Sequence, residues 1–178
     1  FRSESFLLVT FLSRPARERR AMVRGDYFPP VAVIVPCYNE ENTIKGTIDS
    51  LLALNYPADK LSIVLVDDGS KDNTPAVMDG YSDHPQIMVI HKENGGKHTA
   101  LNLGIERVPH AEFFGCLDAD SFVDPDALAE IVGHFNNPSV AAVTAAMSVH
   151  EPKGILERMQ NAEYIFGIAL RQIGRAHV

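Results

Sequence analysis

The stretch Val31-Ala32-Val33-Ile34-Val35-Pro36-Cys37-Tyr38-Asn39-Glu40 joins a continuous apolar run to a short polar loop. β-branched residues dominate the run, which is typical of a strand buried on both faces of a parallel sheet. After the loop, apolar residues recur at helical spacing from Ile44 to Leu52, and this helix is expected to end before Pro57. The stretch therefore predicts the first strand and the first helix of an α/β domain.

The same alternation continues along the chain. Strands are predicted at residues 31–35, 61–66, 86–91, 112–117 and 140–143. Helices are predicted between them, around residues 75–81 and 100–105, and a further helix is expected to take Asp124 as its N-cap and Pro125 as its first residue. Strands that alternate with helices indicate βαβ units, and hence a mostly parallel sheet with right-handed crossovers and flanking helices.

Each of the first four predicted strands ends in a polar loop. The carboxyl ends of parallel strands meet at one edge of a sheet, where open α/β folds bind their ligands. We therefore expect one crevice lined by Tyr38, Glu40, Asp67, Asp68, Lys97, Asp118 and Asp120. The alternative is that these residues form four independent turns and helix caps, which Asp, Gly and Ser favour. The convergence of four loops favours the crevice.

Asp118-Ala119-Asp120 follows the fourth strand directly. Two carboxylates separated by one residue provide the hard oxygen ligands that suit Mg²⁺ or Mn²⁺, and these ions take substrate phosphates as further ligands. The motif is weak when taken alone, because aspartates also cap turns.

The other loops carry features that suit a nucleotide. We expect Tyr38 to pack against a pyrimidine ring, with packing in the core as the alternative. We expect Asp67 or Asp68 to accept a hydrogen bond from the ring N–H, and a turn with a helix cap is the alternative for this stretch. Asn94-Gly95-Gly96-Lys97 opens a helix, where close backbone approach and a lysine favour phosphate. A loop with a solvated lysine is the alternative there. The stretch is not a Walker A loop, because His91 stands where the first glycine is needed.

Composition narrows the class of protein. The chain has 178 residues, of which 46% are hydrophobic and 22% charged, as in a globular domain. A net charge of -7 argues against nucleic acid as the main partner. Cys37 and Cys116 form neither a zinc pattern nor a disulfide framework, so we expect buried thiols and a reducing compartment. The histidines form no metal motif, and surface or satisfied core positions are expected for His98, His134 and His150.

The N-terminal segment combines an apolar run at residues 5–12 with a basic cluster. The run is far shorter than the ~20 residues that a membrane span requires. The cluster consists of Arg14, Arg17, Arg19, Arg20 and Arg24. Arginines after an apolar run are typical of the cytoplasmic end of a transmembrane helix, and a short amphipathic helix on the domain is the alternative. Because the chain starts with Phe1, we expect it to be a piece of a longer protein.

Taken together, four motifs in this order resemble the inverting family 2 glycosyltransferases of the Rossmann-like GT-A fold, and most closely the membrane-bound synthases of β-linked polysaccharides, such as chitin, hyaluronan and poly-N-acetylglucosamine synthases. The resemblance runs from about Val31 to Val143. The motifs are Pro36-Cys37-Tyr38-Asn39-Glu40, Val66-Asp67-Asp68-Gly69-Ser70, Asn94-Gly95-Gly96-Lys97 and Asp118-Ala119-Asp120.

The resemblance implies transfer of a hexose or N-acetylhexosamine from a UDP-sugar to a growing glycan or lipid-linked acceptor, with inversion and with Mg²⁺ or Mn²⁺. The roles of the family's motif residues, applied to the matching positions, imply that Pro36 belongs to the donor site and that Tyr38 and Glu40 contact the nucleoside. Asp67 and Asp68 would hold the base, and Lys97 would face the ribose or phosphates. Asp118 would lie near the ribose or donor sugar, and Asp120 would be the principal metal ligand. It also implies a catalytic domain on the cytoplasmic side of the plasma (inner) membrane.

The chain departs from the family pattern in its last third. Such enzymes carry a Glu-Asp pair, whose aspartate is the general base, and then a Gln-x-x-Arg-Trp segment. Neither occurs here: Gln172-Ile173-Gly174-Arg175 is followed by Ala176, and no Glu-Asp precedes it. We therefore expect the general base beyond Val178 and a GT-A domain truncated at both ends.

This comparison divides the chain into three segments. Residues 1–30 form a basic juxtamembrane or N-terminal segment, residues 31–150 a nucleotide-sugar-binding half-domain, and residues 151–178 a helix that begins the acceptor half. Two other classes stay open. A sugar-1-phosphate nucleotidylyltransferase needs a glycine-rich loop after the first strand, which Pro36-Cys37-Tyr38-Asn39 is not. A non-catalytic nucleotide- or carbohydrate-binding module is the other alternative.

Overall fold

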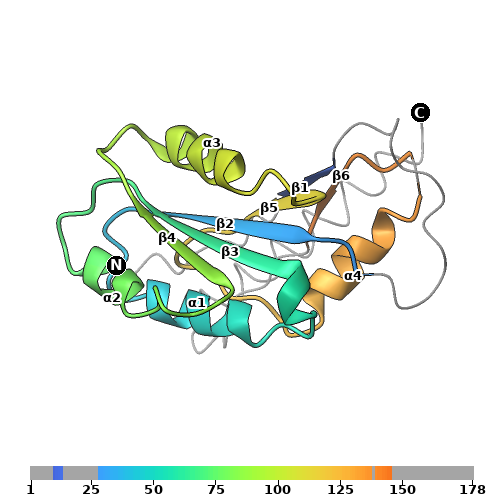
Figure 1. Cartoon of the computed structure of the whole chain (residues 1–178), viewed down its shortest axis with the longest axis horizontal. Coiled ribbons are helices and arrows are strands. Elements are labelled where there is room, and N and C mark those ends of the chain that lie inside the picture. Colours follow the sequence, from blue (N-terminus) through green and yellow to red (C-terminus); the bar gives the residue numbers. More distant parts are fainter. Residues whose placement is uncertain (1–9, 14–27, 138, 146–178) are drawn as a thin grey trace, which may run out of the picture.

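Strands of the computed structural model, which describes residues 10–13, 28–137 and 139–145, form one sheet in the order β4-β3-β2-β5-β1-β6 (Figure 1). The strands are β1 (Thr10–Ser13), β2 (Val31–Cys37), β3 (Leu61–Asp67), β4 (Ile87–His91), β5 (Phe113–Cys116) and β6 (Ala142–Thr144). Strands β4, β3, β2 and β5 run parallel, whereas β1 pairs antiparallel with both β5 and β6. The prediction of a mostly parallel α/β sheet is confirmed.

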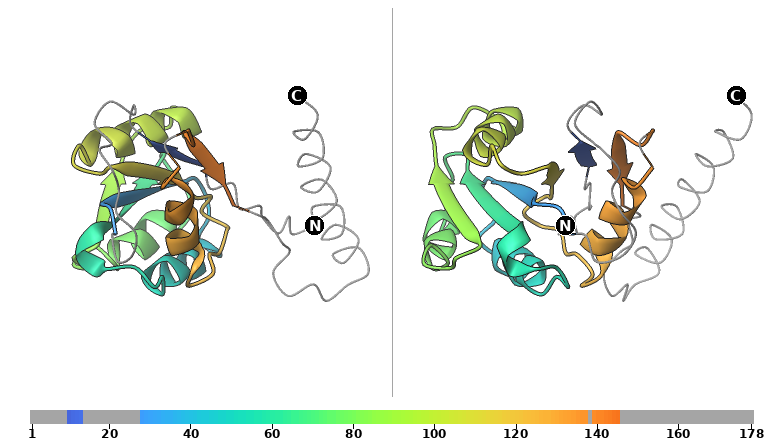
Figure 2. Two further views of the ribbon diagram at one scale, coloured as in Figure 1. Left: turned by 90° about the vertical axis from the view of Figure 1, so that its right-hand side faces the viewer. Right: turned by 45° about the vertical axis from the view of Figure 1, so that its right-hand side comes forward.

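Helices cover both faces of the sheet. They are α1 (Ile44–Leu52), the 3-10 helix η2 (Ala58–Lys60), α2 (Thr74–Asp79), α3 (Lys97–Arg107) and α4 (Ala127–His134). Figure 1 shows α3 on one side of the sheet and α1, α2 and α4 on the other, and Figure 2 shows the same layers from two further directions. This arrangement is the flanked sheet that the alternation of strands and helices predicts.

The alternation of side chains along β2 divides the core between the two faces. Val31, Val33 and Val35 pack into the larger cluster with residues of α1, α2 and α4. Ala32 and Ile34 pack into the smaller cluster beneath α3. Successive residues of a strand point to opposite faces, so a run of β-branched residues with no polar interruption requires burial on both sides.

The order of the strands reverses next to β2. The chain passes from β2 to β3 and β4 on one side, and then returns to place β5 on the other side of β2. In open α/β sheets the crevice for ligands lies outside the carboxyl ends of the strands at such a switch point. The loops that follow β2 and β5 therefore lie on either side of that position.

Two local predictions are wrong. Thr10–Ser13, which overlaps the end of the apolar run at residues 5–12, is a strand and not the end of a helix, because its backbone pairs with β5 on one side and β6 on the other. Helix α4 begins at Ala127, two residues later than predicted from Asp124 and Pro125. Asn55 holds the preceding turn: its backbone N–H donates to Pro125 O (2.7 Å) and its side chain to Asp126 Oδ1 (2.7 Å).

Other predictions fall outside the described residues: the basic cluster between Arg14 and Arg24, the helix at 151–178, and His150. Within the described part of the chain, no helix combines the length and the apolarity needed to cross a bilayer.

Candidate functional site

A cleft of about 220 Å³ lies at the carboxyl edge of the sheet, between the loops that follow β2 and β5. Its lining consists of Pro36, Cys37, Tyr38, Glu40, Asp68, Lys97, Asp118, Ala119 and Asp120. Seven of the eight predicted donor and metal residues are therefore brought to one cleft, from four separate stretches of the chain. The exception is Asp67.

The chain after β5 points its carboxylates into the cleft. Leu117 and Ala119 are buried, whereas Asp118 and Asp120 between and after them are half-buried and line the cleft. Leu117 N–H donates to Ile34 O (3.1 Å), so pairing with β2 extends one residue beyond β5. The buried Thr47 hydroxyl of α1 donates to Ala119 O (2.8 Å) and fixes the turn between the two aspartates. Alternation at the end of a buried strand brings Asp118 to the cleft. A turn, in which Ser121 N–H donates to Asp118 O (3.0 Å), brings Asp120 there.

The loop after β2 contributes an aromatic ring and a carboxylate. Tyr38 is 45% exposed although it is a large side chain, which leaves its ring available to a ligand. Glu40 is half-buried, and its Oε2 accepts a hydrogen bond from Thr43 Oγ1 (2.7 Å). A ring beside carboxylate acceptors at a switch point is the arrangement that suits a nucleoside.

Asp68 links the loop after β3 to the loop before α3. Its carboxylate is buried and accepts hydrogen bonds from the backbone N–H groups of Gly95 (3.0 Å) and Gly96 (2.8 Å), and from Lys92 Nζ. Burial raises the pKa of Asp68, but these donors together outweigh burial, so the pKa is lowered and the carboxylate is ionised at neutral pH.

The glycines before α3 therefore have a different role from the predicted one. We expected their backbone to be available to a phosphate, but both N–H groups are used by Asp68. Gly96 has φ +90, a conformation that glycine adopts without strain, and Lys97 is the first residue of α3. The cation of the cleft is thus the Lys97 side chain, not the peptide groups before it.

Asp67 lies beside the cleft without lining it. Its Oδ1 accepts from Ser70 N–H (3.0 Å) and its Oδ2 is 3.2 Å from His91 Nδ1. The other nitrogen of His91 lies 3.0 Å from Asp79 Oδ1 in α2. Of the two neighbouring aspartates, only Asp68 lines the cleft. Asp67 instead stabilises the loop before α2 through Ser70, and α2 itself through His91 and Asp79.

Lys97 and Asp118 form an ion pair across the cleft. Burial lowers the pKa of Lys97, but Asp118, Cys116 and Asp120 raise it, and the net pKa is above its ordinary value. Lys97 therefore remains charged. Its ammonium group contacts the carboxylate of Asp118, the first aspartate of the Asp-x-Asp motif.

The donor set fits a divalent cation that shares its ligands with a phosphate. Asp118 and Asp120 supply oxygen, the ligand atom that Mg²⁺ and Mn²⁺ prefer. The described residues contain no cluster of three or more His, Cys, Asp or Glu side chains able to hold a metal alone. Mg²⁺ commonly binds through one or two carboxylates together with substrate phosphates and water, so the residues present are sufficient for a metal–diphosphate site.

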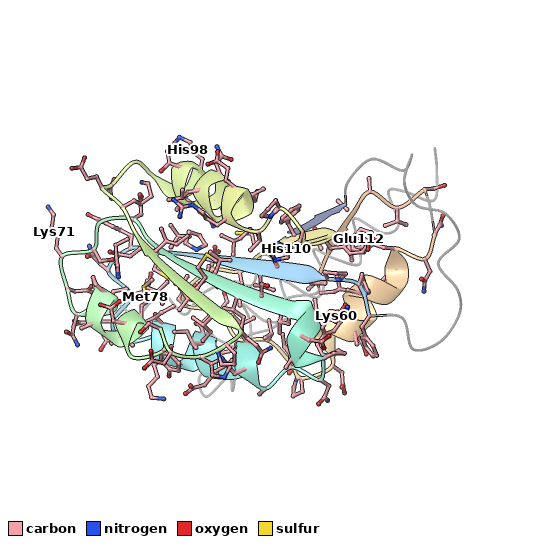
Figure 3. All side chains as sticks on the ribbon, in the orientation of Figure 1. Lys60, Lys71, Met78, His98, His110 and Glu112 are labelled. Carbon is pink, nitrogen blue, oxygen red and sulfur yellow. The ribbon has the colours of Figure 1, made fainter. Side chains whose placement is uncertain are left out.

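Neither cysteine is a candidate nucleophile. Cys37 is 1% exposed, and burial raises its pKa well above the ordinary value, with Asp67 and Glu40 adding to the rise. Burial also raises the pKa of Cys116. Both thiols therefore stay protonated. The expectation of a buried thiol is met by Cys37, whereas Cys116 is half-buried. His98 lies exposed on α3, as Figure 3 shows, and His134 is also exposed.

Sequence patterns alone do not identify the residues whose hydrogen bonds hold the site together. Lys92, Thr47, Asn39 and Ser70 each make hydrogen bonds between segments far apart in the chain. Lys92 has one signal in the sequence, since it directly follows a predicted strand. Asn39 and Ser70 belong to two of the four motifs but have no predicted role there, and Thr47 has no signal, because the partners of all three are set only when these segments meet in the folded chain.

The model of the family described as glycosyl transferase family 2 matches residues 32–175. This range includes β2 from its second residue, β3 to β6 and every residue of the cleft. The chain belongs to glycosyl transferase family 2. The resemblance inferred from the four motifs is confirmed, and so is the GT-A fold.

Curated relatives of this family 2 chain include poly-beta-1,6-N-acetyl-D-glucosamine synthases. One from Staphylococcus epidermidis is 32% identical over 158 residues, which cover 86% of this chain and 38% of the relative. Another from Staphylococcus aureus is 32% identical over 153 residues, or 85% of this chain and 36% of the relative. The chain thus spans little more than a third of these relatives.

Solved structures agree with the fold. A mannosyltransferase from Pyrobaculum calidifontis, PcManGT, in complex with GDP-Man and Mn²⁺, is 35% identical with a TM-score of 0.57, and the match covers 65% of this chain and 34% of that one. TarS 1-349 of S. aureus in complex with UDP is 26% identical with a TM-score of 0.55, and the match covers 60% of this chain and 32% of that one.

Proposed function

We propose that this chain is the donor-binding part of a glycosyltransferase that moves a hexose or N-acetylhexosamine from a UDP-sugar to a growing glycan, with inversion and with the help of Mg²⁺ or Mn²⁺. One observation carries the proposal: an aromatic ring, a lysine and three cleft-lining aspartates meet in one cleft at the switch point of a family 2 sheet. A nucleotide-sugar requires those three kinds of contact, to its base, its diphosphate and its metal.

Each side chain has a role in this proposal. Tyr38 packs against the base, with Pro36 and Glu40 beside the nucleoside. Asp68, already ionised and fixed by the glycine N–H groups, accepts from the ring N–H; Asp67 supports its loop from behind. Lys97 neutralises the diphosphate, and Asp118 lies near the ribose or the donor sugar.

Asp120, with help from Asp118, would hold the metal. When bound, a divalent ion stabilises the charge that develops on the leaving diphosphate. The chain's own contribution is to hold the nucleoside and the diphosphate of the donor in the cleft. The general base that takes the acceptor proton is expected beyond Val178, together with the acceptor site and membrane contacts of the complete enzyme, whose catalytic domain we place on the cytoplasmic side of the plasma (inner) membrane.

A GDP-sugar is a second candidate donor. It is favoured by the likeness to PcManGT, whose complex contains GDP-Man. UDP is favoured by TarS, which was solved with UDP and with UDP-GlcNAc, and by the poly-N-acetylglucosamine synthases among the curated relatives. The two donors differ in the size of the base that Tyr38 and Asp68 must accommodate.

Calorimetric titration with nucleotides tests the proposal. UDP should bind in the presence of Mn²⁺ more tightly than ADP, because adenine has no ring N–H to donate to Asp68, and more tightly than GDP, because guanine presents its ring N–H from a larger purine. Asp68→Ala should remove the preference, at a cost of ~1–3 kcal/mol for the buried groups left unpaired. Tighter binding of GDP would replace the UDP-sugar by a GDP-sugar, and equal binding of all three would leave only a diphosphate site.

A further inference from the structure

Two neighbouring loops at the nucleoside side of the cleft are joined along their length by hydrogen bonds. The first follows β2 and comprises residues 38–43; the second follows β3 and comprises residues 68–73. Three successive N–H groups of the first loop donate to side-chain oxygens of the second loop or of the first residue of α2: Asn39 to Ser70 Oγ (3.0 Å), Glu40 to Thr74 Oγ1 (2.7 Å) and Glu41 to Asp72 Oδ2 (3.2 Å).

The second loop returns hydrogen bonds to the first. The backbone N–H of Lys71 donates to Asn39 Oδ1 (2.7 Å), and that of Asn73 donates to Glu41 Oε2 (2.9 Å). Figure 3 shows the Lys71 side chain pointing away from the body of the molecule, so this residue contributes its peptide group to the contact and its side chain to solvent. Donors and acceptors alternate between the loops, and each loop fixes the conformation of the other.

Asn39 has a second property that singles it out. Its φ is 56°, and it is the one non-glycine residue with positive φ in the part of the chain that the structure describes. Asparagine tolerates this left-handed conformation better than most residues do. The residues on either side of it, Tyr38 and Glu40, line the cleft, whereas Asn39 itself does not. The turn at Asn39 therefore directs its two neighbours toward the cleft.

From this geometry we infer that Asn39 and Glu41 are positioning residues for the nucleoside. In this role they do not contact the ligand themselves. Through their hydrogen bonds to the second loop, they hold the loop that carries Tyr38 and Glu40 in the conformation that binds the nucleoside. The inference rests on the proposed function, because it assumes that the side chains of Tyr38 and Glu40 contact the nucleoside. A loop ordered in advance loses less conformational freedom on binding, so affinity for the nucleoside depends on residues outside the cleft.

The test compares three variants of the whole chain by calorimetry. Asn39→Gly keeps the left-handed backbone but removes the acceptor of Lys71 N–H. Asn39→Asp keeps both the acceptor and the tolerance of positive φ. Asn42→Gly is the matched control, an exposed asparagine in the same loop. Asn39→Gly should lower the affinity for UDP and for uridine by the same factor, about fivefold, which corresponds to the loss of one net hydrogen bond. Asn39→Asp and Asn42→Gly should remain near the wild-type affinity.

The affinity for pyrophosphate in the presence of Mn²⁺ distinguishes a positioning role from a merely structural one. General damage to the domain would weaken pyrophosphate binding as well. The affinity for pyrophosphate should be the same in Asn39→Gly and wild type, because the loops at the nucleoside side do not carry Asp120 or Lys97. Equal losses for pyrophosphate and uridine would overturn the inference, since they would indicate general damage to the domain.

Amide hydrogen exchange tests the loop contact without any ligand. In Asn39→Gly, exchange should accelerate at Lys71 and at residues 39–41, and it should not change in Asn42→Gly. Unchanged exchange in Asn39→Gly overturns the inference. Tyr38→Ala separates this inference from the proposed function: if it weakens UDP while Asn39→Gly does not, the positioning role alone is wrong. If Tyr38→Ala binds UDP as wild type does, or wild type binds none, the proposed nucleoside site is wrong and the inference with it.

Discussion

Asp118 and Asp120 share one cleft but not one environment. Asp118 is bound to Lys97 from the start of α3, and the turn that carries Asp120 is held by Thr47 of α1. A metal that binds between them must compete with the lysine at Asp118. Asp120 is therefore the better candidate for the principal ligand, as the family resemblance implies.

Asp120→Asn should keep the fold but lose the part of UDP affinity that depends on Mn²⁺. Mutating even an outer-shell partner of a metal typically costs 10–100-fold in metal affinity, so loss of the ligand itself should cost at least about tenfold. UDP titrations with Mn²⁺ and with EDTA measure the difference. Asp83→Asn, the same chemical change at an exposed site outside the cleft, is the control. Metal-dependent binding by Asp120→Asn at wild-type strength would refute the assignment.

His91 should make the stability of the domain depend on pH. Hydrogen bonding to Asp79 raises its pKa above the ordinary 6.5, burial lowers it, Asp67 raises it, and the net pKa is raised. A raised folded-state pKa means that the protonated histidine stabilises the fold. This stabilisation is complete below about pH 6.5 and is lost as pH rises through the folded-state pKa.

Urea unfolding of wild type and His91→Gln across this range measures the effect. The wild type should be the more stable below pH 6.5, and its advantage should shrink as the pH rises above that value. An advantage that stays constant or grows with pH would contradict the assignment of charge to His91.

At the scale of elements, α3 approaches β2 closely through Gly104. A Cβ on Gly104 would lie 2.6 Å from Ile34 Cγ2, and Ile34 is 1% exposed in the core beneath α3. The same helix starts with Lys97 at the cleft, so its distance from the sheet also sets the height of the lysine above Asp118. Glycine is therefore required at this position by packing and not by backbone conformation.

Gly104→Ala should destabilise the domain by ~1–3 kcal/mol, the usual cost of forcing an extra methyl group into a packed core. The matched control is Gly133→Ala in α4, where an added Cβ meets nothing within 4 Å. That change should be neutral or stabilising by up to about 1 kcal/mol, because alanine is the better helix former. Chemical unfolding of both variants gives the comparison; equal effects would mean that the contact with Ile34 is unimportant.

At the scale of the whole molecule, the described residues supply the proposed donor site. The sequence contains neither the Glu-Asp pair nor the Gln-x-x-Arg-Trp segment from which the family resemblance implies the base and the acceptor contacts. The 178-residue chain should therefore bind UDP with Mn²⁺ but release no UDP from a UDP-sugar above the protein-free rate. Loss of a general base typically removes ~10²–10⁴ in rate, and loss of the acceptor surface removes positioning as well.

An assay of UDP release with UDP-N-acetylglucosamine, Mn²⁺ and an oligosaccharide acceptor checks this expectation, with binding followed in parallel. Release that depends on the acceptor would show that a carboxylate within these residues acts as the base.

The sequence alone determined the parallel sheet, its first three helices and the group of polar residues at its edge. These follow from local patterns: β-branched runs require burial on both faces, and the loops after parallel strands must meet at one edge. What it could not determine are contacts between segments far apart in the chain. Short runs do not specify their partner, so Thr10–Ser13 was not recognised as a strand paired with β5 and β6.

Only the tertiary structure decided which of two adjacent aspartates faces the cleft and what the glycines before α3 are for. Asp67 and Asp68 are the same residue type one position apart, and the chain around them directs one to His91 and the other to Gly95 and Gly96. The same is true of Asn39, whose partner in the second loop is 32 residues away. Residue chemistry fixes which groups are able to bind, but the direction of each group is fixed by partners that meet only when the chain has folded.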